Sequence, residues 1–172
     1  SFNGTFRSIN TLVGGAGADL LNGANLNNIW KFEVGSLKLE VGSNLLTFSS
    51  IETINGGNDT DTFNINSTLS INLNGGAGGD VFNFAAGSML TGVIDGQGGA
   101  DQLLFTNYNA SVTVTPNTVG ATDGFNGTAS ALNGTFANVD SIIGSTATTD
   151  TLNGANLQTT WSIDAISHSL SA

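Results

Sequence analysis

The residues of this chain best suited to chemistry are three aspartates, each of which closes a glycine-rich phrase. Asp61, Asp80 and Asp101 follow one another at intervals of 19 and 21 residues. If these intervals place them on neighbouring strands, their carboxylates lie about 4.8 Å apart at one corner of the fold. Carboxylates at that distance repel one another, which favours a bound cation or raised pKa values. Asp59 and Asp95 lie close to the same row, so these five acids are the candidate metal ligands.

A second interpretation of the same aspartates stays open, because an aspartate in a turn often only accepts hydrogen bonds from nearby backbone amides. The phrase also varies between copies. Gln97 replaces the second glycine in one copy, Asp59 replaces the fourth-position glycine in another, and residues 145–150 contain no glycine. The aspartates are therefore expected to act either as metal ligands or as turn caps.

The elements that must position these acids are short strands joined by glycine corners. The phrase Gly-Gly-x-Gly-x-Asp-x-(apolar)-x also occurs with its aspartate at Asp19, and a recurrence near 20 residues is typical of stacked coils. Apolar residues flank each phrase at even spacing, which directs them to one face of a strand, while the glycine pair permits a sharp corner. The expected buried rows are Leu12, Ile54, Leu73 and Ile94 before the glycines, then Leu21, Phe63, Phe82 and Leu103, and Ile65, Phe84 and Phe105, after the aspartates.

These patterns predict an all-β fold, a right-handed parallel β-helix (β-solenoid) with about 20 residues in each of about eight coils. Composition agrees, since the chain has 24 glycines, one proline and no cysteine, and only 9% of its residues are charged. Few of its residues favour helices, and many favour corners and strands. At 39% hydrophobic residues the chain can fill a core, and its stability does not depend on disulfides.

A longer repeat overlies the short one. Residues 4–34 and 134–161 are near-copies at an offset of 130 residues, or 131 after one inserted residue near Thr146, and a looser copy begins at Phe48. We therefore expect a single solenoid over residues 1–172, in which 1–130 form one long repeat and 131–172 begin a second. Near-identical first and last coils without visible caps predict end-to-end stacking on copies of itself or on adjacent repeats, with an axial repeat of about 40 Å.

Residues 106–133 depart from the phrase. Val112 and Val114 alternate with polar residues as in one more strand, and Pro116 is expected to block a central position of a sheet. Residues 120–130 are expected to form a longer corner or loop, which is where a binding surface could be carried.

Charge excludes one class of function. The net charge is −10, and the positive residues are Arg7, Lys31 and Lys38. Nucleic-acid binding requires a basic surface, so no nucleic-acid partner is expected. An apolar run of about 20 residues is also missing, so no membrane span is expected, and Ser1 does not open an export signal.

The glycine phrases carry a family resemblance. Residues 14–22, 56–64, 75–83 and 96–104 are similar to the nonapeptide of RTX (haemolysin-type calcium-binding) proteins, and the longer context resembles the β-strand repeats of large secreted bacterial surface adhesins. The resemblance implies a parallel β-helix at the bacterial cell surface or in the extracellular space. It also implies calcium at the corners of Asp61, Asp80 and Asp101, held by carboxylates and backbone carbonyls. Partners of such a module would be copies of itself, or cell-surface glycans or proteins.

The leading functional prediction is a structural and adhesive module or filament subunit without enzyme activity. A polysaccharide-active β-helix enzyme is one alternative, with Glu33 and Glu40 as a carboxylate pair. The alternation of their segment, with Lys31 and Lys38 as charge partners, instead indicates a solvent-facing strand. An ice-binding solenoid is the other alternative, but the Thr-x-Thr pairs do not recur coil after coil.

Two remaining residue types give little support to catalysis. His168 is the only histidine and lies in a serine-rich tail, so a zinc site or a Ser-His-Asp arrangement is poorly supported. Trp30 and Trp161 occupy equivalent repeat positions, which predicts packing in the core or at a corner instead of sugar stacking.

Overall fold

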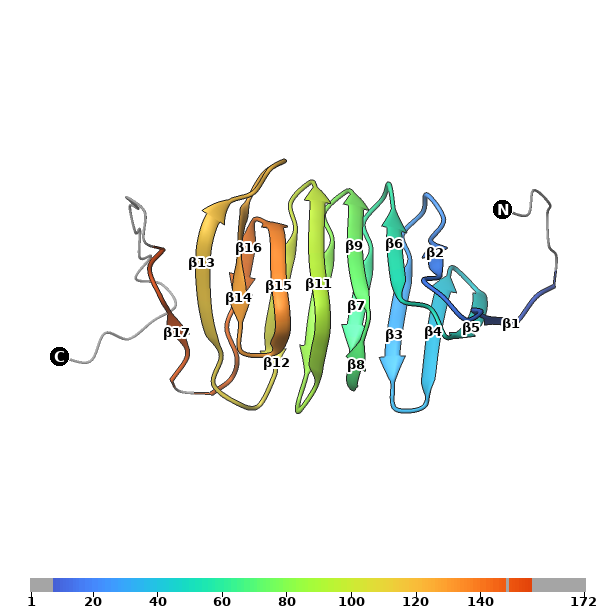
Figure 1. Cartoon of the computed structure of the whole chain (residues 1–172), viewed down its shortest axis with the longest axis horizontal. Coiled ribbons are helices and arrows are strands. Elements are labelled where there is room, and N and C mark those ends of the chain that lie inside the picture. The colour runs from blue at the N-terminus through green and yellow to red at the C-terminus, as the bar shows by residue number, and fades with distance from the viewer. Residues whose placement is uncertain (1–7, 148, 156–172) are drawn as a thin grey trace.

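The computed structural model describes residues 8–147 and 149–155 and shows two stacked, mostly parallel β-sheets in a solenoid-like arrangement (Figure 1). Within that range every regular element is a strand, and there is no helix long and apolar enough to cross a membrane. The first sheet contains, in spatial order, β1 (Thr11–Val13), β5 (Asn44–Ser49), β4 (Ser36–Val41), β3 (Ile29–Glu33), β7 (Thr62–Ile65), β10 (Val81–Ala85), β12 (Gln102–Asn107) and β16 (Ser141–Ile143). The second contains β17 (Thr151–Leu152), β13 (Thr113–Val119), β14 (Phe125–Ala129), β15 (Leu132–Val139), β11 (Met89–Gly98), β9 (Asn72–Ala77), β6 (Thr53–Gly57) and β2 (Leu20–Asn22), with β8 (Thr68–Ser70) paired to β11.

Parallel pairing stacks like on like in the middle of the molecule. In the first sheet Phe82 is in register with Phe63 on one side and with Leu103 on the other. In the second sheet Leu73 is in register with Ile54 and Ile94. All of these side chains are buried, so the predicted rows are confirmed for this part of the chain.

Aromatic rings form the centre of the core between the sheets. The ring centroids of Trp30 and Phe63 lie 6.1 Å apart and those of Phe63 and Phe82 4.7 Å apart, with nearly parallel planes. Phe84 and Phe105 stack in the same way at 4.9 Å. Trp30 is fully buried, which confirms the predicted core packing for this tryptophan. Its counterpart Trp161 lies outside the described residues.

The first glycine phrase does not take the predicted register. Leu12 pairs with Phe48 in the first sheet, and Leu21 pairs with Ile54 in the second, so neither joins its expected row. Trp30 instead stands in register with Phe63. The reason is that Gly23 and Asn28 repeat the glycine-to-aspartate spacing of the later phrases, and the strand that follows Asn28 takes the place next to β7.

Two antiparallel meanders interrupt the parallel stack, which the sequence did not predict. The first meander comprises β3, β4 and β5 and lies in the first sheet; the second comprises β13, β14 and β15 and lies in the second sheet. Two-residue turns at 34–35 and 42–43 connect the first meander, and Gly35 and Gly42 adopt positive φ angles of 73° and 60° there. Glycine accepts such angles without steric cost, which suits it to tight hairpin turns.

Ion pairs cross the outer face of the first meander. The Lys31 ammonium lies 2.8 Å from the Glu40 carboxylate, and the Lys38 ammonium lies 2.7 Å from that of Glu33. The hydrogen bond from Lys38 lowers the pKa of Glu33. The predicted charge pairing is therefore confirmed, although the residues belong to a hairpin and not to a single strand.

The segment expected to form a loop contains a strand instead. β14 pairs antiparallel with β13, and Pro116, which was expected to block a central position, stands opposite Gly127 inside the pairing. The register shifts between Pro116 and Thr118. Proline has no N–H to donate to a neighbouring strand, so a break in the register is where a sheet tolerates it.

Candidate functional site: an aspartate column and an acidic corner

Five polar residues form a hydrogen-bonded column along one edge of the stack, which we call the aspartate column. Asn28 N donates to Asp61 Oδ1 at 2.7 Å, and Asp61 N donates to Asp80 Oδ1 at 2.8 Å. Asp80 N donates to Asp101 Oδ1 at 2.8 Å, and Asp101 N donates to Asp140 Oδ2 at 2.9 Å. Each of the four aspartate side chains thus accepts the backbone amide of its neighbour in the stack.

A glycine five residues earlier makes room for the carboxylates of Asp61, Asp80 and Asp101. A Cβ on Gly75 would collide with Asp80 Oδ2 and lie 2.7 Å from the carbonyl oxygen of Gly96. Gly56 and Gly96 stand in the same relation to Asp61 and Asp101. The first glycine of the phrase is therefore required because the carboxylate and a neighbouring carbonyl occupy the space of a side chain.

Replacing Gly75 by alanine is expected to lower the free energy of unfolding by about 1–3 kcal/mol, because the added methyl group must displace backbone or a buried carboxylate. Gly15→Ala is the matched control. A Cβ at Gly15 has its nearest neighbour, Asp19 Oδ2, at 3.9 Å, so a change below about 0.5 kcal/mol is expected. Urea denaturation of both variants measures the difference, and equal midpoints would contradict the steric argument.

The second oxygens of the column carboxylates have no hydrogen-bond partner. Oδ2 of Asp61, Asp80 and Asp101 is buried and unpaired in each case. Asn28 shows which kind of atom fits at the place of these Oδ2 atoms, because its Nδ2 donates to the carbonyl oxygen of Gly56 at 3.1 Å. A hydrogen-bond donor therefore fits at this position. An ionised carboxylate has only acceptors, whereas a protonated carboxyl group would supply the donor.

Burial raises the pKa values of three column aspartates, Asp61, Asp80 and Asp101. Desolvation is the largest cause in each case and raises the pKa of Asp80 to about 7 and that of Asp101 to about 6. The pKa of Asp61 is also raised by burial. Accepted backbone hydrogen bonds oppose these shifts, and the neighbouring carboxylates reinforce them. The column therefore holds protons near neutral pH that free aspartates would have lost.

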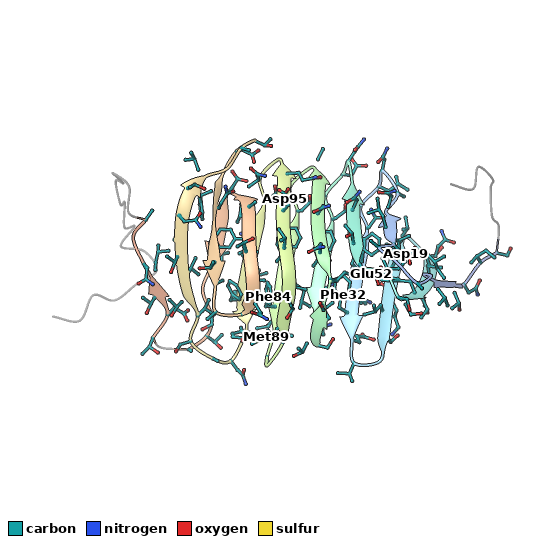
Figure 2. The ribbon with its side chains drawn as sticks, in the orientation of Figure 1. Asp19, Phe32, Glu52, Phe84, Met89 and Asp95 are labelled. Carbon is teal, nitrogen blue, oxygen red and sulfur yellow. The ribbon has the colours of Figure 1, made fainter. Side chains whose placement is uncertain are left out.

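The structure brings three of the five predicted metal ligands into the column and places the other two beside it. Asp59 is exposed, and its charge contributes to the raised pKa of Asp61. Asp95 Oδ1 accepts hydrogen bonds from Gln97 N at 3.1 Å and from Asn138 Nδ2 at 2.7 Å, near the end of β11 (Figure 2). Calcium at these five residues stays a prediction. The column aspartates accept hydrogen bonds from backbone amides in neighbouring levels of the stack, and not from amides of their own turns.

The outermost copies of the aspartate, Asp19 and Asp150, form other hydrogen bonds. Asp19 N donates to Glu52 Oε2 at 2.8 Å, and Val112 N donates to Asp150 Oδ1 at 2.8 Å. Asp19 is therefore linked to Glu52 and not to Asp61. The same pairing of a backbone amide with an acid recurs at these positions.

An acidic corner lies where the column meets the second meander. One carboxylate oxygen each from Asp101, Asp123 and Asp140 lies within 4.8 Å of the others. Asn138 organises the loop here, since its Oδ1 accepts from Thr122 N at 3.0 Å and its Nδ2 donates to Asp95. The sequence interpretation did not identify Asp123 and Asp140 as candidate ligands. Asp140 had one signal: it precedes the apolar Ile142 of β16 by two residues, as Asp61 precedes Phe63.

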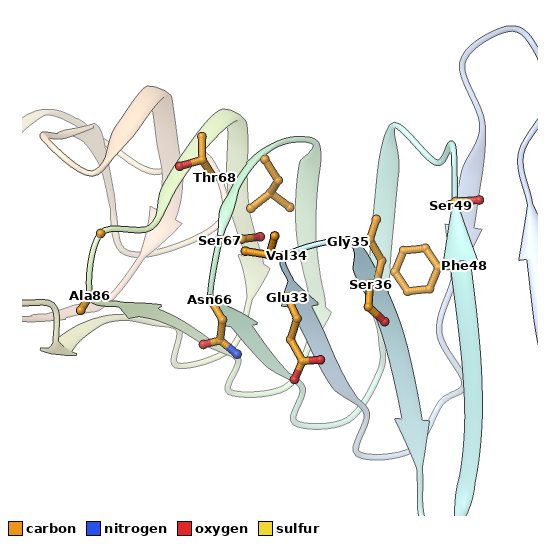
Figure 3. Close-up of a pocket in the computed structure, with 13 residues that line it drawn as sticks. Glu33, Val34, Gly35, Ser36, Phe48, Ser49, Asn66, Ser67, Thr68 and Ala86 are labelled. Atoms are coloured by element: carbon orange, nitrogen blue, oxygen red, sulfur yellow. The ribbon is translucent and has the colours of Figure 1, made fainter.

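A shallow hollow of about 750 Å³ lies at the opposite ends of the strands (Figure 3). Phe48 lies at one side and Ala86 at the other, and the turn after β3 forms part of its wall. Its one acidic lining residue, Glu33, is paired with Lys38. The hollow is thus a weaker candidate site than the acidic corner. His168 lies outside the described residues.

Comparisons of this chain with protein-family models, with curated proteins and with solved structures find no match. The column, the acidic corner and the strand order of the sheets are therefore the features that bear on function.

Proposed function

We propose that this chain is a structural and adhesive module: a right-handed β-solenoid, with coils of about 20 residues where no meander intervenes, that belongs to an extracellular bacterial surface adhesin or filament. The extracellular placement comes from the resemblance of the glycine phrases to secreted repeat proteins. The structural role comes from the strand order, which suits continuation along the stacking axis.

One observation carries the proposal: from one sequence copy to the next, both sheets extend by the same number of strands. β1 and β16 hold equivalent residues at an offset of 130, and β2 and β17 do so at an offset of 131. β1 and β16 lie seven strand positions apart in the first sheet, and β2 and β17 lie seven positions apart in the second. A following copy could therefore extend both sheets without a mismatch, at about 34 Å per repeat.

The two meanders explain this equality. β4 and β5 add two strands to the first sheet, and β13 and β14 add two to the second. Either insertion alone would leave one sheet longer than the other and would tilt any repeat that followed. One meander in each sheet restores the balance, as expected for a module that repeats along an axis.

Apolar side chains at the β1 and β2 end supply a surface for association. Val13 is 65% exposed and Leu20 is 54% exposed, although both lie on strands. Beside them, a hollow of about 230 Å³ is lined by Ile9, Leu12, Leu39, Val41, Asn44, Leu45 and Leu46. Exposed apolar side chains next to a sheet edge favour pairing with another chain, and we propose a second copy or an adjacent repeat as the partner.

End-to-end assembly is expected to appear as rods or filaments with an axial repeat of about 34 Å in negative-stain images, and as concentration-dependent sedimentation. Val13→Asp should reduce assembly, because it places a charge in the apolar end. Val93→Asp is the control, since Val93 is a half-exposed residue in the middle of the second sheet. A chain that stays monomeric at high concentration, or equal assembly of the two variants, would rule out self-association through this end.

A further inference from the structure

We propose that Asp101, Asp123 and Asp140 bind one calcium ion, which fastens the second meander to the end of the aspartate column. The three acids come from separate segments. Asp101 precedes β12, Asp123 lies between β13 and β14, and Asp140 lies between β15 and β16. This site shares only Asp101 with the row predicted from the glycine phrases, and it does not depend on an adhesive function.

The backbone orients all three carboxylates and leaves one oxygen of each without a backbone donor. Asp101 Oδ1 accepts from Asp80 N, Asp123 Oδ2 accepts from Gly99 N at 3.1 Å, and Asp140 Oδ2 accepts from Asp101 N. Asp101 is completely buried, and its Oδ2 has no hydrogen-bond partner. Asp123 Oδ1 is likewise buried and unpaired. Asp101 and Asp123 thus each carry one buried, unpaired carboxylate oxygen, which is costly unless a cation or a donor satisfies it.

The distances suit calcium. Ligand oxygens that share one calcium ion each lie 2.3–2.6 Å from it, so two of them on opposite sides are separated by about 4.8 Å. One oxygen from each of the three acids lies within 4.8 Å of the others. All the ligands are oxygen atoms, which calcium prefers, whereas zinc favours nitrogen and sulfur. Magnesium requires shorter, near-octahedral bonds and is expected to bind more weakly here.

The negative charge at the acidic corner also favours a bound cation. The lysines of the described segments 8–147 and 149–155 are Lys31 and Lys38, and both are paired with glutamates on the first meander. The corner therefore gathers three carboxylates, with Asp95 nearby, without a lysine to compensate them. A bound cation would neutralise it.

A calcium titration of the thermal unfolding temperature tests the proposal on the full chain after treatment with EDTA. With a dissociation constant of about 0.1–1 mM, 10 mM calcium should raise the unfolding temperature by about 3–10 °C, and magnesium should raise it less. Asp123→Asn should weaken calcium binding at least about tenfold, and Asp140→Asn should do the same. Asparagine retains an oxygen that can accept the backbone hydrogen bond, so circular dichroism should show both variants folded.

Glu52→Gln is the matched control, because it also removes one negative charge from an exposed carboxylate that accepts a backbone hydrogen bond, from Asp19 N, outside the corner. It should leave the calcium response unchanged. The proposal is overturned if calcium leaves the wild-type unfolding temperature unchanged, if a folded Asp123→Asn or Asp140→Asn variant responds like the wild type, or if Glu52→Gln loses the response to the same extent.

Discussion

Replacing Phe82 by aspartate is expected to unfold the chain at room temperature. The Phe82 side chain is fully buried, stacks on Phe63 and stands in register with Leu103. Loss of the buried ring costs about 3–5 kcal/mol, and an unpaired carboxylate in its place adds several more. Their sum is comparable to the whole stability of a typical domain, about 5–15 kcal/mol.

Circular dichroism and urea denaturation measure the outcome. Val81→Asp is the control, because Val81 precedes Phe82 on β10 and is only partly buried, on the opposite face of the strand. That variant should keep the β-sheet spectrum and most of its stability. A Phe82→Asp chain as stable as the wild type would contradict the buried row and with it the stacking of β7, β10 and β12.

The rows between residues 54 and 105 could be predicted because the short repeat is uninterrupted there. Each phrase brings its glycine corner and its flanking apolar residues at the same spacing, so local chemistry and stacking agree. Asn28 could also have been found. It follows Gly23 by five residues, as Asp61 follows Gly56, and it takes the corresponding place in the column.

The sequence contains a pattern that predicts the first meander and that was not used. Glu-Val-Gly-Ser occurs at residues 33–36 and again at 40–43, between alternating apolar segments. Two-residue turns with glycine at positive φ are the usual connection of a β-hairpin. Under the assumption of a fixed coil length, the same residues were interpreted as one solvent-facing strand. The register predicted for the first phrase was therefore wrong.

The acidic corner could not be derived from spacing alone. Asp123 and Asp140 lie 22 and 39 residues beyond Asp101, and the second meander brings them back to it. That meander requires β14 to pair with both β13 and β15 across register shifts, one of them at Pro116. Such pairings depend on long-range contacts, about which local propensity carries little information.

Lowering the pH from 8 to 5 in the presence of EDTA is expected to stabilise the folded chain. The pKa of Asp80 is about 7 in the folded state and 3.8 in a free chain, so the folded state binds the proton more tightly. The resulting stability is fully present below about pH 3.8 and is lost as the pH rises through about 7. The expected gain between pH 8 and pH 5 is on the order of 3 kcal/mol. Asp101, with a pKa of about 6, acts in the same direction.

Two groups, Glu33 and Asp150, have the opposite effect on stability, but they titrate outside the range from pH 5 to pH 8. The pKa values of Glu33 and Asp150 are lowered, so their contributions are lost only at more acidic pH. The groups that act on Asp80 are the neighbouring carboxylates of Asp61 and Asp101, and both raise its pKa further. Between pH 5 and pH 8 the column should therefore dominate the pH dependence, with greater stability at the acidic end.

Asp80→Asn separates the column from other causes of this pH dependence. Its Oδ1 can accept the hydrogen bond from Asp61 N, and its Nδ2 would face the carbonyl oxygen of Gly96, as Asn28 Nδ2 faces that of Gly56. The variant should be more stable than the wild type at pH 8 and should show a flatter profile in urea denaturation from pH 5 to pH 8. Glu52→Gln, which removes an exposed charge outside the column, should keep the wild-type slope. If Asp80→Asn kept the full slope, or lost stability at pH 8, the column aspartates would be ionised in the folded chain and the unpaired oxygens would need another partner.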